Sequence, residues 1–180
     1  MIQNSNRPLF DARGTTVTQW GQDQTGTVMY TINNQGFRSH QEYNWVPTYA
    51  FFGSSTVFGI GIDDNDLLVN QFTNAHNYGL AGNYLNGESL ENLKNFVASS
   101  LYNNTQIIFF WIDRLDKEDI NQLILQADEL SSNILHISQG AKYSGAINLM
   151  PHIDFDVSKT QPGIKTHQLW AKTIKLCLKK

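Results

Sequence analysis

Short apolar runs alternate along this chain with segments in which apolar residues recur every three or four positions. The apolar runs predict strands at 27–32, 49–52, 105–112 and 133–137, and a short strand that ends near 77–82. The helical spacing predicts a short helix at 67–72 and helices that start near Glu88, at Asp116 and at Pro162. Strands that alternate with helices in this way predict a parallel sheet covered on both faces, which is a three-layer α/β domain.

The N-terminal region has a different pattern. Residues 1–26 are polar, and Phe10 and Trp20 are their most prominent apolar anchors. We therefore expect an irregular arm that lies over the domain. The chain of 180 residues has no internal repeat and no shift in composition, so it fits one domain over 1–180. Within it we expect an N-terminal arm and hairpin at 1–46 and the α/β core at 47–180.

Composition and charge exclude several classes of function. A net charge of −3 gives no electrostatic case for binding nucleic acid or an anionic membrane. The lone Cys177 excludes an internal disulfide, and no Cys/His spacing resembles a zinc site. The acidic run at 63–66 lacks the Gly and Glu spacing of a calcium loop. We therefore expect no metal and no cofactor. We also expect a cytoplasmic protein, because the first residues lack an apolar signal core and no 18 apolar residues run together.

One turn carries candidate chemistry. The strand that ends at Phe52 runs into Gly53, Ser54 and Ser55, so it presents a hydroxyl where a short helix begins. Helix N-termini carry free N–H groups and a positive dipole end, which suit chemistry that develops negative charge. Ligands of parallel sheets bind at the carboxyl ends of the strands. Ser55 and three further residues fall after predicted strands or in a late loop, and so can converge on that edge: Gly82, Asp113 and Asp156. A plain turn of small residues is the alternative.

Several blocks of the chain resemble the SGNH (GDSL-type) hydrolases. The blocks are 34–38 (NQGFR), 52–61 (FGSSTVFGIG) and 77–82 (NYGLAG). A terminal block at 160–167 (TQPGIKTH) is similar to the His-Pro-Gly-x-x-Thr-His sequence of one subgroup. The likeness runs from about residue 33 to 174. It implies a flavodoxin-like αβα sandwich and ester hydrolysis or acyl transfer by a serine nucleophile.

The resemblance also implies roles for individual residues. Ser55 aligns with the nucleophile, and Ser54 replaces the Asp that usually precedes it. The backbone N–H groups of Ser55 and Gly82 would form an oxyanion hole, which stabilises charge that appears only in the tetrahedral intermediate. The substrate would be an ester of a small molecule, a carbohydrate or a lipid, with no cofactor.

The chain departs from the family pattern in two places. The third family block usually supplies an oxyanion Asn, whereas this chain has Asp113 and Arg114. Arg114 or Asn83 could donate instead, or Asp113 and Arg114 could simply pair. The second departure is Gln161, which occupies the position of the catalytic His. A carboxamide does not titrate near neutral pH and therefore cannot act as a general base.

These departures leave more than one function open. His152 could supply a relocated base, and Asp154 or Asp156 of the same loop could orient it, whereas His167 is expected to pack within the core. The first hypothesis is therefore an SGNH-type esterase that acts through Ser55. The second is a catalytically impaired relative that binds a ligand in the retained site. A third is that Gln161 is an introduced substitution in an active enzyme.

Overall fold

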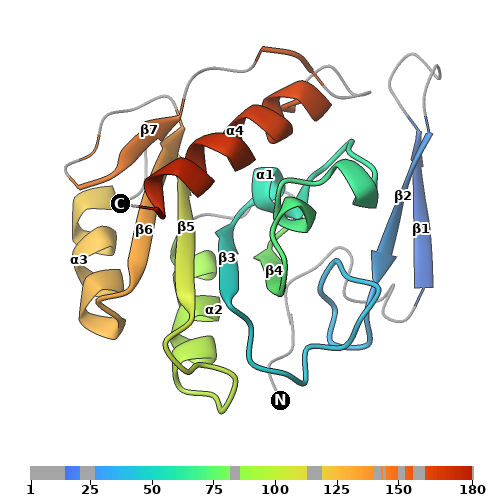
Figure 1. Cartoon of the computed structure of the whole chain (residues 1–180). Coiled ribbons are helices and arrows are strands. Elements are labelled where there is room, and N and C mark those ends of the chain that lie inside the picture. The colour runs from blue at the N-terminus through green and yellow to red at the C-terminus, as the bar shows by residue number, and fades with distance from the viewer. Residues whose placement is uncertain are drawn as a thin grey trace.

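The computed structural model describes residues 15–20, 27–81, 86–112, 119–139, 143, 145–149, 153–155 and 161–179. A five-stranded parallel sheet forms the centre of the fold, in the order β4-β3-β5-β6-β7 (Figure 1). Its strands are β3 (Tyr49–Gly53), β4 (Ala75–Gly79), β5 (Gln106–Ile112), β6 (Ile134–Gln139) and β7 (Ile147–Leu149). Numbered by their sequence within this sheet, the strands run 2-1-3-4-5, which is the flavodoxin-like order. The predicted α/β fold is confirmed.

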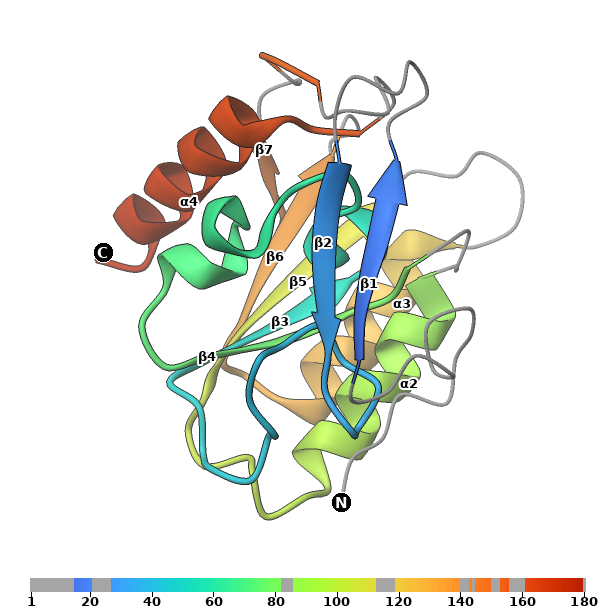
Figure 2. The same cartoon turned by 90° about the vertical axis from the view of Figure 1, so that its right-hand side faces the viewer.

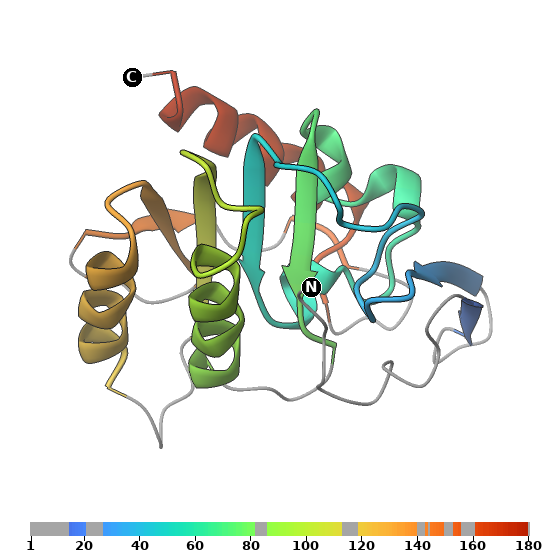
Figure 3. The ribbon, with the colours of Figure 1, turned by 90° about the horizontal axis from the view of Figure 1, so that it is seen from below.

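Helices cover both faces of the sheet (Figure 2). On one face lie α2 (Asn86–Val97) and α3 (Ile120–Leu130), side by side in Figure 3. On the other lie α4 (Ile164–Cys177) and the segment that follows α1 (Ser55–Phe58). Residues of β5 alternate between the faces, so Phe109 packs toward α2 and α3 and Phe110 packs toward α4. This double burial explains the continuous apolar run of β5.

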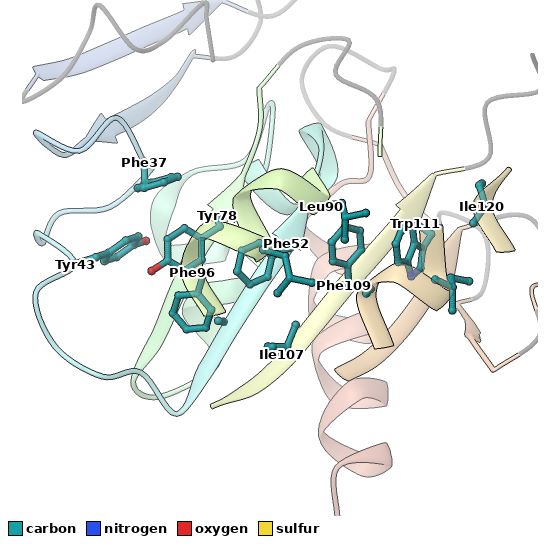
Figure 4. Close-up of a cluster of buried hydrophobic side chains, with 14 residues drawn as sticks. Phe37, Tyr43, Phe52, Tyr78, Leu90, Phe96, Ile107, Phe109, Trp111 and Ile120 are labelled. Carbon is teal, nitrogen blue, oxygen red and sulfur yellow. The ribbon is translucent and has the colours of Figure 1, made fainter. Parts of the chain in front are cut away.

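The core between the sheet and α2/α3 is built largely from aromatic rings (Figure 4). Phe52 stacks on Tyr78 at 4.9 Å between ring centroids, and Phe109 stacks on Trp111 at 4.0 Å. Phe52 also stacks on Phe109 at 6.2 Å, so these rings connect β3 with both β4 and β5.

A separate hairpin precedes the sheet. β1 (Thr15–Trp20) pairs antiparallel with β2 (Thr27–Ile32), beyond the β4 edge in Figures 1 and 3. The sequence predicted β2 but no strand within 1–26, because the polar run TTVTQW shows no sustained apolar alternation. A turn follows β2, with Gly36 in the left-handed region at φ 85°.

Helix boundaries differ from the sequence prediction in three places. The short helix predicted at 67–72 is replaced by two 3-10 turns, Asp64–Asp66 and Val69–Gln71. α3 begins at Ile120, with Asp119 as its N-cap, while Asp116 lies outside the described residues. α4 begins at Ile164 rather than at Pro162, because Pro162 forms a β-bridge with Phe155. No helix in the described part of the chain has the length and apolar character needed to cross a membrane.

Candidate functional site

Ser55 lies at the carboxyl end of β3, next to β5, where the strand order reverses. The strand ends at Gly53, whose φ of +151° disfavours any residue with a Cβ. A Cβ at Gly53 would also lie 2.7 Å from Val57 Cγ2 and 2.9 Å from Phe110 Cβ. The glycine therefore allows the chain to turn tightly from β3 into α1, with Ser55 as the first helical residue.

The block at 77–79 holds α1 against the sheet. A Cβ at Gly79 would lie 2.2 Å from the backbone nitrogen of Phe58, so only glycine permits this approach. Asn77 Nδ2 donates to the carbonyl of Val57 at 3.0 Å, and Asn77 Oδ1 accepts from the Gly79 N–H at 2.9 Å. These contacts fix the position of the short helix that carries Ser55.

Arg38 donates hydrogen bonds to backbone carbonyls at the end of α1 and in the turn that follows it. Arg38 is 3% exposed, and its guanidinium donates from Nε to Asp64 Oδ1 at 2.8 Å. It also donates to the carbonyls of Phe58 (3.0 Å), Gly59 (2.5 Å) and Ile62. Burial lowers the pKa of Arg38, and the charge of Asp64 opposes that shift. The turn after the Ser55 helix thus depends on one buried cation.

Gln161 is the side chain that meets Ser55. Ser55 Oγ donates to Gln161 Oε1 at 3.4 Å, across 106 positions of sequence. The sequence placed Gln161 where a catalytic His would stand, and the structure brings these two residues together. The amide oxygen can accept the hydroxyl proton in a hydrogen bond but cannot remove it.

Asp154 contacts the start of α4, which begins three residues after Gln161. Its carboxylate accepts from the N–H groups of Lys165 (2.8 Å) and Thr166 (2.7 Å), and its carbonyl accepts from Gly163 N–H at 3.0 Å. Partial desolvation acts to raise the pKa of Asp154, but hydrogen bonds from Thr166 and Lys165 outweigh it, and the pKa is lowered. The sequence makes Asp154 a possible orienter of a base; in the structure its carboxylate caps the N-terminus of α4.

A second glutamine lies beside the same helix. Thr56 Oγ1 donates to Gln139 Oε1 at 3.3 Å, and Gln139 is the last residue of β6. Gln139 Nε2 is buried and has no hydrogen-bond partner within the described structure. No sequence pattern points to Gln139, since a glutamine at a strand end belongs to no motif.

The other predicted site residues divide into two groups. Gly82, His152 and Asp156 lie outside the described residues, as do Asn83, Asp113 and Arg114. His167 is described, and its Nδ1 accepts from the Leu68 N–H at 3.0 Å within the core. The predicted packing role of His167 is confirmed.

Two further histidines are engaged elsewhere in the core. His136 Nδ1 accepts from Trp111 Nε1 at 2.9 Å, and its Nε2 faces Asp128 Oδ1 at 2.9 Å. His76 pairs its Nδ1 with the Tyr78 hydroxyl at 2.9 Å, and burial lowers the pKa of His76 to about 3. Within the described ranges, no histidine hydrogen-bonds to Ser55.

The described residues contain no group of three or more His, Cys, Asp or Glu placed to hold a metal ion. The part of the site that the structure describes consists of hydroxyls and carboxamides at the carboxyl edge of the sheet. A scan against models of known protein families gives no match for the chain, and searches of curated proteins and of solved structures give no significant match either.

Proposed function

We propose that this protein binds an ester-like ligand on a serine-hydrolase scaffold whose general base is missing. The observation that carries the proposal is the hydrogen bond from Ser55 Oγ to Gln161 Oε1 at 3.4 Å. In a serine hydrolase that position belongs to an imidazole, which takes the hydroxyl proton as the nucleophile attacks. Gln161 keeps the hydrogen bond and lacks the basicity.

The chemistry of the pair predicts weak turnover. General-base assistance contributes roughly 10²- to 10⁴-fold in rate, and a serine without a base is a poor nucleophile. Binding at the edge of the sheet does not need a base. The pair therefore suits recognition of an ester-like ligand better than its hydrolysis.

The second candidate function is ester hydrolysis with His152 as a relocated base and Asp156 as its orienter. It is favoured by the placement of Ser55, which is only partly buried at the carboxyl edge where ligands of such sheets bind. Ser55 would attack the ester carbonyl while His152 takes its proton, and the backbone N–H groups of Ser55 and Gly82 would donate to the oxyanion. The alcohol would leave with the proton from His152, and water would then hydrolyse the acyl-serine to the free acid.

The test uses a fluorophosphonate probe, which reacts with an activated serine, and hydrolysis of p-nitrophenyl acetate. We expect the natural chain to label slowly and Gln161→His to gain labelling and hydrolysis, because imidazole can take the Ser55 proton. The gain must disappear in the double variant that also carries Ser55→Ala. Gln122→His, on the exposed face of α3, is the matched control and gains nothing.

A second part of the test adds the carboxylate that orients the His in a catalytic triad. In the family pattern an Asp stands three positions before the His, and Ser158 occupies that position here. Ser158→Asp is therefore combined with Gln161→His. Ser55-dependent hydrolysis by the natural chain, lost in His152→Ala, would establish the second candidate instead. If neither 161 variant labels although both are folded, the serine-hydrolase scaffold is the wrong interpretation.

A further inference from the structure

The hydroxyls of two neighbouring residues on α1 each donate a hydrogen bond to a glutamine from another part of the chain. Ser55 Oγ donates to Gln161 Oε1 at 3.4 Å, and Thr56 Oγ1 donates to Gln139 Oε1 at 3.3 Å. Gln161 directly precedes Pro162 at the approach to α4, and Gln139 ends β6. The two carboxamides are thus brought to the same short helix by separate parts of the chain.

The hydrogen bond from Thr56 determines which end of the Gln139 amide is occupied. With Oε1 engaged, the NH₂ group is directed away from Thr56. Gln139 Nε2 is buried without a hydrogen-bond partner in the described structure. A buried donor left unpaired costs about 1–3 kcal/mol, and native proteins rarely retain one without a role. A ligand oxygen would satisfy it.

The lack of charge on the side chains described near Gln139 indicates which kind of ligand oxygen could bind there. The side chains at this edge that the structure describes are uncharged: Ser54, Ser55, Thr56, Gln139 and Gln161. Burying a carboxylate or phosphate among uncharged groups carries a large desolvation cost, whereas a neutral carbonyl needs only a hydrogen-bond donor. Because neither Thr56 nor Gln139 carries a positive charge, the Gln139 donor left free in the described structure suits a neutral oxygen acceptor.

We propose that Gln139 is a ligand-binding residue whose Nε2–H donates to an uncharged carbonyl oxygen, of an ester or amide, on a ligand bound beside Ser55. The inference rests on the proposed function in that it names the group recognised at the same site. Thr56 is a positioning residue, because its hydroxyl orients the amide that makes the contact.

The test titrates the natural chain with N-methylacetamide, a neutral carbonyl compound that a serine hydrolase does not readily cleave, and with acetate as its charged counterpart. The readout is the NMR signal of the Gln139 side-chain amide, assigned by its absence in Gln139→Glu. We expect a saturable shift with N-methylacetamide and none with acetate. A fragment of this size binds weakly, so the titration extends to about 100 mM.

Variants separate binding from structure. Gln139→Glu replaces the donor with a carboxylate and is expected to weaken N-methylacetamide binding about tenfold, read from backbone amide shifts near Ser55. Thr56→Val keeps the side-chain shape and frees the amide to rotate, so binding weakens about two- to fivefold. Gln122→Glu adds the same charge on exposed α3 and leaves binding unchanged. If Gln139→Glu does not fold, the binding of N-methylacetamide to Thr56→Val decides the question.

The outcomes distinguish this inference from the proposed function. Absence of a saturable shift, equal binding of acetate, or unchanged binding in both Gln139→Glu and Thr56→Val overturns the role of Gln139. None of these results depends on whether Gln161→His activates Ser55, which the fluorophosphonate labelling measures separately. Conversely, N-methylacetamide binding that requires Gln139 supports the inference even where Ser55 stays unreactive.

Discussion

Replacing Arg38 by Met removes the guanidinium and keeps most of the aliphatic stem. Arg38 is almost fully buried, and its donors reach Asp64 and the carbonyls of Phe58, Gly59 and Ile62. The Met side chain still packs near Tyr30, whose ring centroid lies 4.5 Å from the guanidinium carbon. The substitution therefore removes the polar part of the interaction more than the packing.

The expected loss in the free energy of unfolding comes from the groups that Arg38→Met leaves without a partner, which are Asp64 and the backbone carbonyls. Removing one partner of a buried ion pair costs about 3–5 kcal/mol, because the other charge and its hydrogen-bonding neighbours lose their partner. The Asp64 side chain is 15% exposed and also contacts His40 Nε2 at 2.8 Å, which softens the loss. We therefore expect a loss of about 3 kcal/mol. For a chain of this size that corresponds to roughly 6–12 °C in Tm.

Urea unfolding followed by tryptophan fluorescence measures the effect, since Trp111 and Trp170 are buried in the two halves of the core. Lys94→Met is the matched control. Lys94 pairs with Glu91 at 3.5 Å on the exposed face of α2, and such pairs contribute about 0.5 kcal/mol or less. Both variants remove one positive charge and introduce the same side chain.

The difference in stability between Arg38→Met and Lys94→Met decides whether the buried guanidinium stabilises this turn. If Arg38→Met loses no more stability than Lys94→Met, the buried guanidinium does not hold the turn after α1. A change in the denaturant slope rather than the midpoint would also contradict it, because the slope reports the surface exposed on unfolding.

Three further predictions concern other parts of the fold. Gly79→Ala places a Cβ 2.2 Å from the Phe58 nitrogen and is expected to cost about 3 kcal/mol or more in urea unfolding; Gly145→Ala, with no atom within 4 Å, should cost only the backbone strain of about 1–2 kcal/mol. Burial lowers the pKa of His76 from 6.5 to about 3, so only the unfolded chain takes up this proton as the pH falls through that interval. The free energy of unfolding should therefore decrease from pH 6.5 toward 4, and His76→Phe should flatten that decrease; an unchanged pH profile would contradict the assignment. Asp154→Ala removes the α4 cap and should cost about 1 kcal/mol at pH 7. Because the pKa of Asp154 is lowered from 3.8, its contribution is lost only as the pH falls below that value, so natural chain and variant should converge in strong acid and differ at neutrality.

The elements that were predicted well are those in which burial dictates the residues. β5 shows a continuous apolar run because both its faces are covered, and the apolar residues of α2 follow the helical period because one face is covered. The position of Ser55 followed from the same logic, since a parallel strand that ends in Gly-Ser-Ser places the hydroxyl at the carboxyl edge.

Three contacts between distant segments were not predicted. Asp154 caps a helix ten residues further along the chain, and nothing in its own neighbourhood indicates that role. Arg38 belongs to the block at 34–38, yet the carbonyls to which it donates lie some twenty residues further along the chain. Gln139 depends on Thr56, and a pairing between two ordinary polar residues leaves no local pattern.

Pro162, next to Gln161, forms a β-bridge with Phe155, and Asp154 accepts a hydrogen bond from the Thr166 N–H at the start of α4. These contacts hold the backbone beside position 161 and do not involve the side chain at that position. Codons for glutamine and histidine differ by a single base in the third position. One point mutation thus separates the present carboxamide from an imidazole beside Ser55, on a backbone that contacts of the neighbouring residues already hold in place.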